Sequence, residues 1–131
     1  MTRYVLDTSA VLSVLFGEPE GRRVIEILAQ AEEGAALVLI PFLALMESEY
    51  HLLRRFEPER VESSLLLIEG WPATVVESDE AWRREAARIK AHGRLSLADA
   101  WMAALAMLRE AELVHKDPEF DRVAGLRSVR L

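Results

Sequence analysis

Two short apolar runs, separated by helical segments, constrain the fold of this chain more than any other feature. Residues 4–6 and 36–40 contain no charged residue and no polar alternation, which is typical of strands buried on both faces of a parallel sheet. Apolar residues elsewhere recur at helical spacing, with capping or breaking residues between the segments. Helices are expected over residues 8–16, 20–33, 42–56, 58–69, 79–91 and 97–111, and further strands over 73–76, 113–115 and 126–131. This alternation predicts an α/β sandwich with a parallel sheet.

Length and composition favour one folded domain over residues 1–131. The 131 residues, 51% of them hydrophobic, are enough for a single core, and the chain has no internal repeat, low-complexity segment or linker. The absence of Cys excludes disulfides, thiolate metal sites and Cys nucleophiles. No signal peptide is recognisable, and the longest apolar stretch, residues 35–46, is too short to span a bilayer. A soluble cytoplasmic protein with no membrane partner is therefore expected.

The charge balance is acidic, with 22 Asp and Glu against 16 Lys and Arg and a formal net charge of −6. This argues against a general nucleic-acid coat protein, which would normally be basic, but it is compatible with an enzyme that holds nucleic acid through metal ions. Only five of the acids are Asp. Because Asp is a poorer helix former than Glu and favours caps and turns, each Asp position needs a local explanation.

Two of these Asp residues follow predicted strands. Asp7 ends the first strand, and Asp117 lies just beyond a late one. In an open parallel sheet, ligands bind beyond the carboxyl ends of the strands, so the two side chains are expected on the same rim. Each residue also has a purely structural explanation, because Asp7 is placed to cap the following helix and Asp117 to form a turn before Pro118.

Two further groups of acids lie in predicted helices. Asp99 stands three residues after Ser96, at capping-box spacing, and opens an almost wholly apolar helix, where a carboxylate needs a partner or a cation. In the helix over residues 42–56, Glu49 falls within the apolar arc and Glu47 falls beside it. The helical wheel does not choose between these two Glu residues, and either one also suits a solvated face or an ion pair with a neighbouring Arg.

A buried group of carboxylates requires compensating positive charge. Mg²⁺ or Mn²⁺ suits this role, because such ions take oxygen ligands and, in pairs, promote phosphodiester cleavage. A zinc site is disfavoured, since the three His residues are scattered and no HExxH spacing occurs. The sequence also lacks GxGxxG, P-loop and GxSxG motifs, so dinucleotide binding, P-loop NTPase activity and α/β-hydrolase chemistry have no support.

A resemblance to a known family rests on four segments, which are YVLDTSAVL at residues 4–12, LME at 45–47, LSLADA at 95–100 and LVHKDPEF at 113–120. Across essentially the whole chain, the sequence resembles the PIN-domain nucleases, and in particular the small VapC-type toxins of bacterial and archaeal toxin–antitoxin modules. The resemblance implies a PIN-like three-layer α/β/α sandwich with a central, mainly parallel sheet of four to five strands. It also implies an endoribonuclease that uses Mg²⁺ or Mn²⁺ and leaves a 5′-phosphate and a 3′-hydroxyl.

The resemblance assigns the site residues by position. It implies a catalytic site of four acids and selects Glu47 over Glu49. Asp7 and Asp99 are expected to be direct metal ligands, whereas Glu47 and Asp117 are expected to act through water or through their charge. It also implies supporting roles for Thr8 and Ser9, and His115, which lies two residues before Asp117, is a further candidate for a supporting role.

Two details near the strand ends stay open. The hydroxyls of Thr8 and Ser9 are expected to hold a metal-bound water or a carboxylate. His115 departs from the family pattern, in which many members carry Thr, Ser or Asn at this position. A neutral, packed His and a His that titrates or donates to a phosphate are both compatible with the sequence. Glu119 and Asp121 rank below the assigned residue as the fourth acid.

The resemblance further implies protein partners. VapC-type toxins are commonly neutralised by a cognate antitoxin and commonly form homodimers, so this chain is expected to bind RNA, an antitoxin and a second copy of itself. The apolar helices over residues 42–56 and 58–69 offer surfaces for such contacts, although burial in the domain core explains their composition equally well.

Two alternatives belong to other functional classes. A phosphoacceptor receiver-like signalling domain is also an α/β domain of about this length, but it needs adjacent acids after the first strand and a Lys at the end of a late strand. This chain has a lone Asp7 at the first position and, at the second, Lys116 as a partial match. A catalytically inactive PIN fold that only binds RNA or a partner would not need all four acids, which this chain has.

Overall fold

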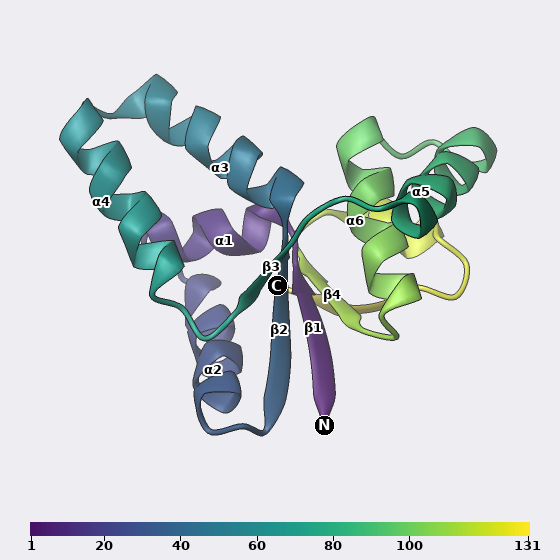
Figure 1. Ribbon diagram of the computed structural model, residues 1–131, viewed down its shortest axis with the longest axis horizontal. Coiled ribbons are helices and arrows are strands. Elements are labelled where there is room, and N and C mark those ends of the chain that lie inside the picture. Colours follow the sequence, from purple (N-terminus) through teal and green to yellow (C-terminus); the bar gives the residue numbers. More distant parts are fainter.

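The middle layer of the structure is a five-stranded sheet in which every neighbouring pair of strands is parallel (Figure 1). The structure is a computed structural model that describes residues 1–131. The strands are β1 (Thr2–Leu6), β2 (Ala36–Pro41), β3 (Thr74–Val76), β4 (Glu112–His115) and β5 (Arg127–Arg130). Their order across the sheet is β3-β2-β1-β4-β5, with β1 in the centre.

Helices cover both faces of the sheet and complete a three-layer α/β/α sandwich, which confirms the expected fold class. The helices are α1 (Thr8–Leu15), α2 (Gly21–Glu32), α3 (Phe42–Arg55), α4 (Pro58–Glu69), α5 (Glu80–His92) and α6 (Leu97–Leu108). On one face, α5 packs against α6, and α6 contacts β1 and β4. On the other face lie α1 and α2, and α3 and α4 form a hairpin that extends outward from them (Figure 1).

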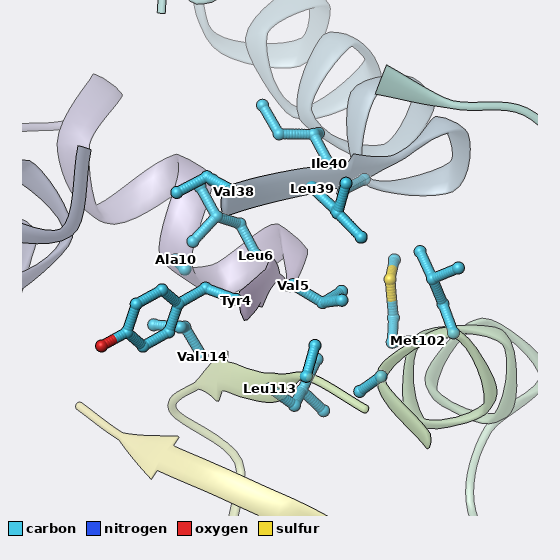
Figure 2. Close-up of a cluster of buried hydrophobic side chains, with 14 of the residues drawn as sticks. Tyr4, Val5, Leu6, Ala10, Val38, Leu39, Ile40, Met102, Leu113 and Val114 are labelled. Carbon is cyan, nitrogen blue, oxygen red and sulfur yellow. The ribbon is translucent and has the colours of Figure 1, made fainter. Parts of the chain in front are cut away.

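Core side chains alternate between the two faces of the sheet, as the two-residue period of a strand requires. In Figure 2, Val5, Leu39 and Leu113 point toward Met102 of α6, whereas the adjacent strand residues point to the side of Ala10 in α1. All of these side chains are buried. The apolar runs lack polar alternation because helices cover both sides of the central strands.

The order of the strands reverses beside β1. The chain passes from β1 to β2 and β3 on one side and then crosses to β4 and β5 on the other side. In open parallel sheets, the crevice at such a reversal, beyond the carboxyl ends of the strands, is where ligands bind. β1 ends directly before Asp7, and β4 ends two residues before Asp117, so the topology places both acids at this crevice.

An aromatic cluster fixes α3, α5 and α6 relative to one another. The rings of Trp82, Trp101 and Phe42 meet edge to face, with centroids between 5.0 and 5.8 Å apart. The indole Nε1 of Trp82 donates a hydrogen bond of 2.7 Å to the Trp101 carbonyl oxygen. Because α6 carries Asp99 in its first turn and α3 carries Glu47, the cluster also holds two of the expected site acids in place.

The helix boundaries agree closely with the sequence expectation except at the end of α6, which stops at Leu108 rather than at Ala111. Glu110 adopts a left-handed backbone conformation with a φ of 51°, and the Ala111 N–H donates to the Ala106 carbonyl oxygen at 2.8 Å. This geometry is a Schellman-type helix end, which is usually built around Gly. The sequence carries no signal for it because Glu occupies the Gly position.

Two other features of the helices bear on the sequence expectations. A 3₁₀ helix, η1 (Pro118–Arg122), follows β4, where the pattern predicts only a turn. None of the six α-helices has the length and the apolar character that a membrane crossing would need.

Candidate functional site

Asp7 lies directly after β1 and is almost completely buried, with 6% of the residue exposed. It occupies the N-cap position of α1, but its side chain makes no capping hydrogen bond. Instead, its Oδ2 accepts a hydrogen bond of 2.8 Å from the Ser9 hydroxyl. No basic side chain forms an ion pair with it. The carboxylate is therefore held in one orientation without compensating charge.

The electrostatic environment of Asp7 disfavours its charged form. The pKa of the carboxyl group is raised from 3.8 to about 6, mainly because burial disfavours the charge. The Ser9 hydrogen bond lowers this pKa in part, and the charge of Asp99 contributes to raising it. Ionising such a group at neutral pH costs free energy unless a cation compensates. Carboxyl groups perturbed in this way concentrate at functional sites, so the shift supports a cation-binding role for Asp7.

Ser9 connects the ends of the two central strands. Its Oγ donates to Asp7 and accepts a hydrogen bond of 3.1 Å from the backbone N–H of Lys116, the residue that follows β4. These two hydrogen bonds fasten the segment after β4 to the end of β1 and orient the Asp7 carboxylate. The geometry agrees with the expectation that Ser9 holds a carboxylate.

Thr8 makes the corresponding contact to α3. Its Oγ1 donates a hydrogen bond of 2.6 Å to Oε1 of Glu47. Glu47 is partly buried, whereas Glu49 is exposed, so the structure brings Glu47 and not Glu49 to the end of β1. The apolar arc that includes Glu49 on the helical wheel is not a buried face, since Met46 and Leu53 on the same arc are also exposed.

Asp99 lies in the first turn of α6, where Ser96 is the N-cap. The Ser96 Oγ accepts a hydrogen bond of 3.1 Å from the Asp99 N–H, as the sequence predicts. Burial raises the pKa of the Asp99 carboxyl group, and the charges of Asp117, Glu47 and Glu119 raise it further. The strand order and the hydrogen bonds of Thr8 and Ser9 place the acids at the ends of β1 and β4, and the direction of this pKa shift agrees with that placement.

Asp117 is held by the turn after β4. Its Oδ1 accepts a hydrogen bond of 2.9 Å from the Glu119 N–H, as expected for a turn residue, and its Oδ2 accepts none. Its own N–H donates to Nδ1 of His115 at 3.1 Å. The two hydrogen bonds fix the turn and leave one carboxylate oxygen of Asp117 available.

His115 is a packed, neutral side chain. It is fully buried, its ring centroid lies 4.7 Å from that of Phe120, and burial lowers the pKa of the imidazole. Because Nδ1 accepts a hydrogen bond, the ring proton is assigned to Nε2, which has no hydrogen-bond partner. Of the two alternatives open from the sequence, the structure supports the packed one and adds that His115 holds the backbone of Asp117.

The acids of the site lack a basic partner. None of the seven ion pairs in the structure includes any of the four acids, Asp7, Glu47, Asp99 and Asp117. The nearby Lys116 pairs instead with Glu18 and Glu20, at 3.3 and 3.9 Å. Oxygen ligands that are partly desolvated and unpaired fit a hard divalent cation such as Mg²⁺ or Mn²⁺.

The spacing of these acids limits how they would hold an ion. No group of three or more Asp, Glu or His side chains lies close enough together to hold a metal ion directly. Like charges repel, so carboxylates without a cation stay apart. Ligation by two carboxylates, with the others acting through water, is compatible with this spacing, because Mg²⁺ usually keeps several waters.

Two acids near the site differ in their involvement. Asp121 pairs with Arg130 at 3.3 Å and is exposed, so it takes no part in the acidic group. Glu119 is also exposed, but its charge raises the pKa of Asp99. Sequence reasoning ranks Glu119 low, and its only signal is a position two residues after Asp117 in a turn.

One known family accounts for nearly the whole chain. The profile of the PIN domain family matches residues 4–126 of the 131. The matched segment includes every residue of the acidic site. No curated protein sequence matches the chain.

Solved structures with the same fold also cover nearly the whole chain. DNA-bound VapBC from Salmonella typhimurium is 21% identical, with a TM-score of 0.83 over 99% of this chain and 98% of the matched chain. VapBC2 from Rickettsia felis, bound to a promoter DNA fragment, is 16% identical, with a TM-score of 0.83 over 98% of both chains. VapC20 from Mycobacterium tuberculosis, a toxin that cleaves the sarcin–ricin loop, is 16% identical, with a TM-score of 0.73 over 98% of this chain and 99% of the matched chain. These similarities show a shared fold.

Proposed function

Because this chain belongs to the PIN-domain family, we propose that it is an endoribonuclease dependent on Mg²⁺ or Mn²⁺. The observation that carries the proposal is the group of four acids without basic partners at the strand-order reversal, with Asp7 buried among them. RNA as the substrate class is supported by the structurally similar VapC20, which cleaves the sarcin–ricin loop.

The proposed roles of the acids follow from their contacts. Asp7 and Asp99 are assigned as direct ligands, because both carboxyl groups have a raised pKa and no basic partner. Glu47, oriented by Thr8, and Asp117, oriented by its turn, each have a carboxylate oxygen free to accept a hydrogen bond from water. A bound divalent ion would neutralise charge on the phosphodiester and activate the attacking water. The expected products carry a 5′-phosphate and a 3′-hydroxyl, as the family resemblance implies.

We also propose that the protein is the toxin of a toxin–antitoxin module, with a cognate antitoxin and a second copy of itself as partners. The similar structures from Salmonella typhimurium and Rickettsia felis are VapBC complexes, which supports an antitoxin. The hairpin of α3 and α4 exposes four large apolar side chains, Met46, Leu53, Leu66 and Leu67. Exposed apolar surface of this kind is typical of a protein interface.

A receiver-like signalling domain does not fit the sheet. In the flavodoxin-like order 2-1-3-4-5, the first strand lies between the second and third strands. Here β1 lies between β2 and β4. The remaining alternative, a PIN fold without catalysis, differs from the proposal only in activity and is decided by a cleavage assay.

Asp99→Asn is expected to slow the cleavage of a labelled single-stranded RNA in Mg²⁺ or Mn²⁺ by at least about a hundredfold, because it removes a charged ligand. EDTA is expected to stop cleavage by the unmodified chain. Asp79→Asn is the matched control, since Asp79 caps α5 through the Trp82 N–H at 2.8 Å and Asn caps a helix equally well. Undiminished cleavage by Asp99→Asn would show that the site is wrongly assigned. No cleavage by the unmodified chain in either metal would favour the inactive binding module.

A further inference from the structure

A cavity lies between α5, the loop that leads into α6, and η1. Its volume is about 330 Å³, which lies within the range of sites for small organic ligands. Its apolar lining comes from three parts of the chain, with Ile89 on α5, Leu95 before α6 and Val123 after η1. The cavity is therefore formed only when these separate segments fold together.

Basic side chains surround this apolar lining. Arg88 pairs with Glu85, but Arg94 and Arg122 form no ion pair or side-chain hydrogen bond and are exposed. His92 also lines the cavity. Glu119 is the one acid of the lining without an ion pair, so the two unpaired arginines leave the cavity with a net positive charge, which favours an anionic ligand.

The cavity and the acidic site share a boundary. Glu119 lines the cavity, and its backbone N–H donates to the Asp117 carboxylate at 2.9 Å. Arg94 and Leu95 also line the cavity, and they come directly before Ser96, the N-cap of the helix that carries Asp99. An extended polymeric ligand that crosses the four acids would therefore continue into this cavity.

We propose that this cavity binds a nucleotide of single-stranded RNA next to the phosphodiester that is cleaved. The base would lie against Ile89, Leu95 and Val123, and Arg94 and Arg122 would contact the flanking phosphates. Proteins bind single-stranded nucleic acid by stacking unpaired bases on flat side chains, His and Arg among them, and by placing basic groups along the backbone. The lining of this cavity has such groups in His92, Arg94 and Arg122. This inference rests on the proposed function, since it requires RNA at the acidic site.

The test measures RNA binding in EDTA, by fluorescence anisotropy with a short, labelled, mixed-sequence RNA, in single-stranded form and as a duplex. Arg94→Gln and Arg122→Gln are each expected to weaken binding of the single strand by about fivefold and to lower its salt slope by about 0.7. Arg83→Gln is the matched control. Arg83 is exposed and unpaired on α5, but it does not line the cavity. The Arg83→Gln variant should bind the single strand with the same affinity as the unmodified chain.

The duplex separates a nucleotide site from general charge attraction, because paired bases cannot enter the cavity. The proposal expects the two cavity substitutions to affect the duplex no more than Arg83→Gln does. Equal losses for single strand and duplex, equal losses for all three variants, or no loss at all would each overturn it.

The same variants in a cleavage assay separate this inference from the proposed function. If the unmodified chain cleaves RNA in Mn²⁺ but Arg94→Gln and Arg122→Gln bind and cleave normally, only the cavity assignment is wrong. If the unmodified chain cleaves no RNA, the proposed function fails and the nucleotide site fails with it.

Discussion

Asp7→Asn is expected to make the metal-free protein more stable by about 1–3 kcal/mol at pH 7.5 and to reduce RNA cleavage by at least about a thousandfold. Asp7 is 6% exposed, its pKa is raised to about 6, and no cation pairs with it. The folded protein must therefore bear the cost of an ionised, desolvated carboxylate. Asn has nearly the same shape, can still accept the Ser9 hydrogen bond and carries no charge.

The gain from Asp7→Asn should depend on pH with a definite sign. The pKa of Asp7 is about 6 in the folded state and 3.8 for an unperturbed Asp, the value taken for the unfolded state. Between these two pH values the folded state of the unmodified chain therefore binds more protons than the unfolded state. Its stability contribution from Asp7 is fully present below 3.8 and is lost as the pH rises through about 6. The advantage of the Asn variant should therefore be small near pH 4 and constant above about pH 7.

Urea unfolding in EDTA between pH 4 and pH 8 measures this difference, with Asp79→Asn as the control for an Asp at an exposed cap. Adding Mn²⁺ should stabilise the unmodified chain and the control but not Asp7→Asn. If Asp7→Asn is less stable than the unmodified chain at pH 7.5 in EDTA, the carboxylate stabilises the fold as a cap. In that case Asp7 is wrongly assigned as a metal ligand whose charge destabilises the metal-free protein.

Trp82→Ala is expected to destabilise the protein by about 3–5 kcal/mol, which is a large part of the stability of a domain of this size. Trp82 is 1% exposed, packs edge to face against Trp101 at 5.0 Å and Phe42 at 5.6 Å, and donates the hydrogen bond that ties α5 to α6. Its removal would leave a cavity between α5 and α6 and would remove the hydrogen bond between the two helices.

Urea unfolding also measures the effect of Trp82→Ala, and two variants serve as its controls. Trp82→Phe should cost less, because it keeps an aromatic ring in the cluster and loses only the indole N–H and part of the volume. Ile25→Ala, at a side chain that is 55% exposed on α2, should change stability by less than about 1 kcal/mol. A loss of less than about 1 kcal/mol for Trp82→Ala would contradict the role of the aromatic cluster in fixing α3, α5 and α6.

Much of the fold was predictable because its signals are local. The apolar run without polar alternation that forms β2 and the cap at Ser96 each act within a few residues. The position of Asp7 and Asp117 on one rim was also predictable, since the carboxyl ends of parallel strands share an edge of the sheet. The end of α6 was not, because Glu110 takes a backbone conformation that its residue type does not indicate.

The remaining features of the site depend on contacts between distant parts of the chain. The choice between Glu47 and Glu49 is not contained in α3 itself. It follows from the hydrogen bond to Thr8 and from the way α3 leaves the sheet. The cavity with Arg94 and Arg122 forms from segments on both sides of α6 and β4, so no sequence pattern indicates it.

The central claim, that Asp7 and Asp99 hold a divalent metal ion, is tested most directly by calorimetric titration with Mn²⁺. The unmodified chain and Asp79→Asn should bind Mn²⁺ with the same affinity, and Asp7→Asn and Asp99→Asn should each bind it at least about a hundredfold more weakly. If all four proteins bind Mn²⁺ equally well, the acidic group at the ends of β1 and β4 is not the metal site.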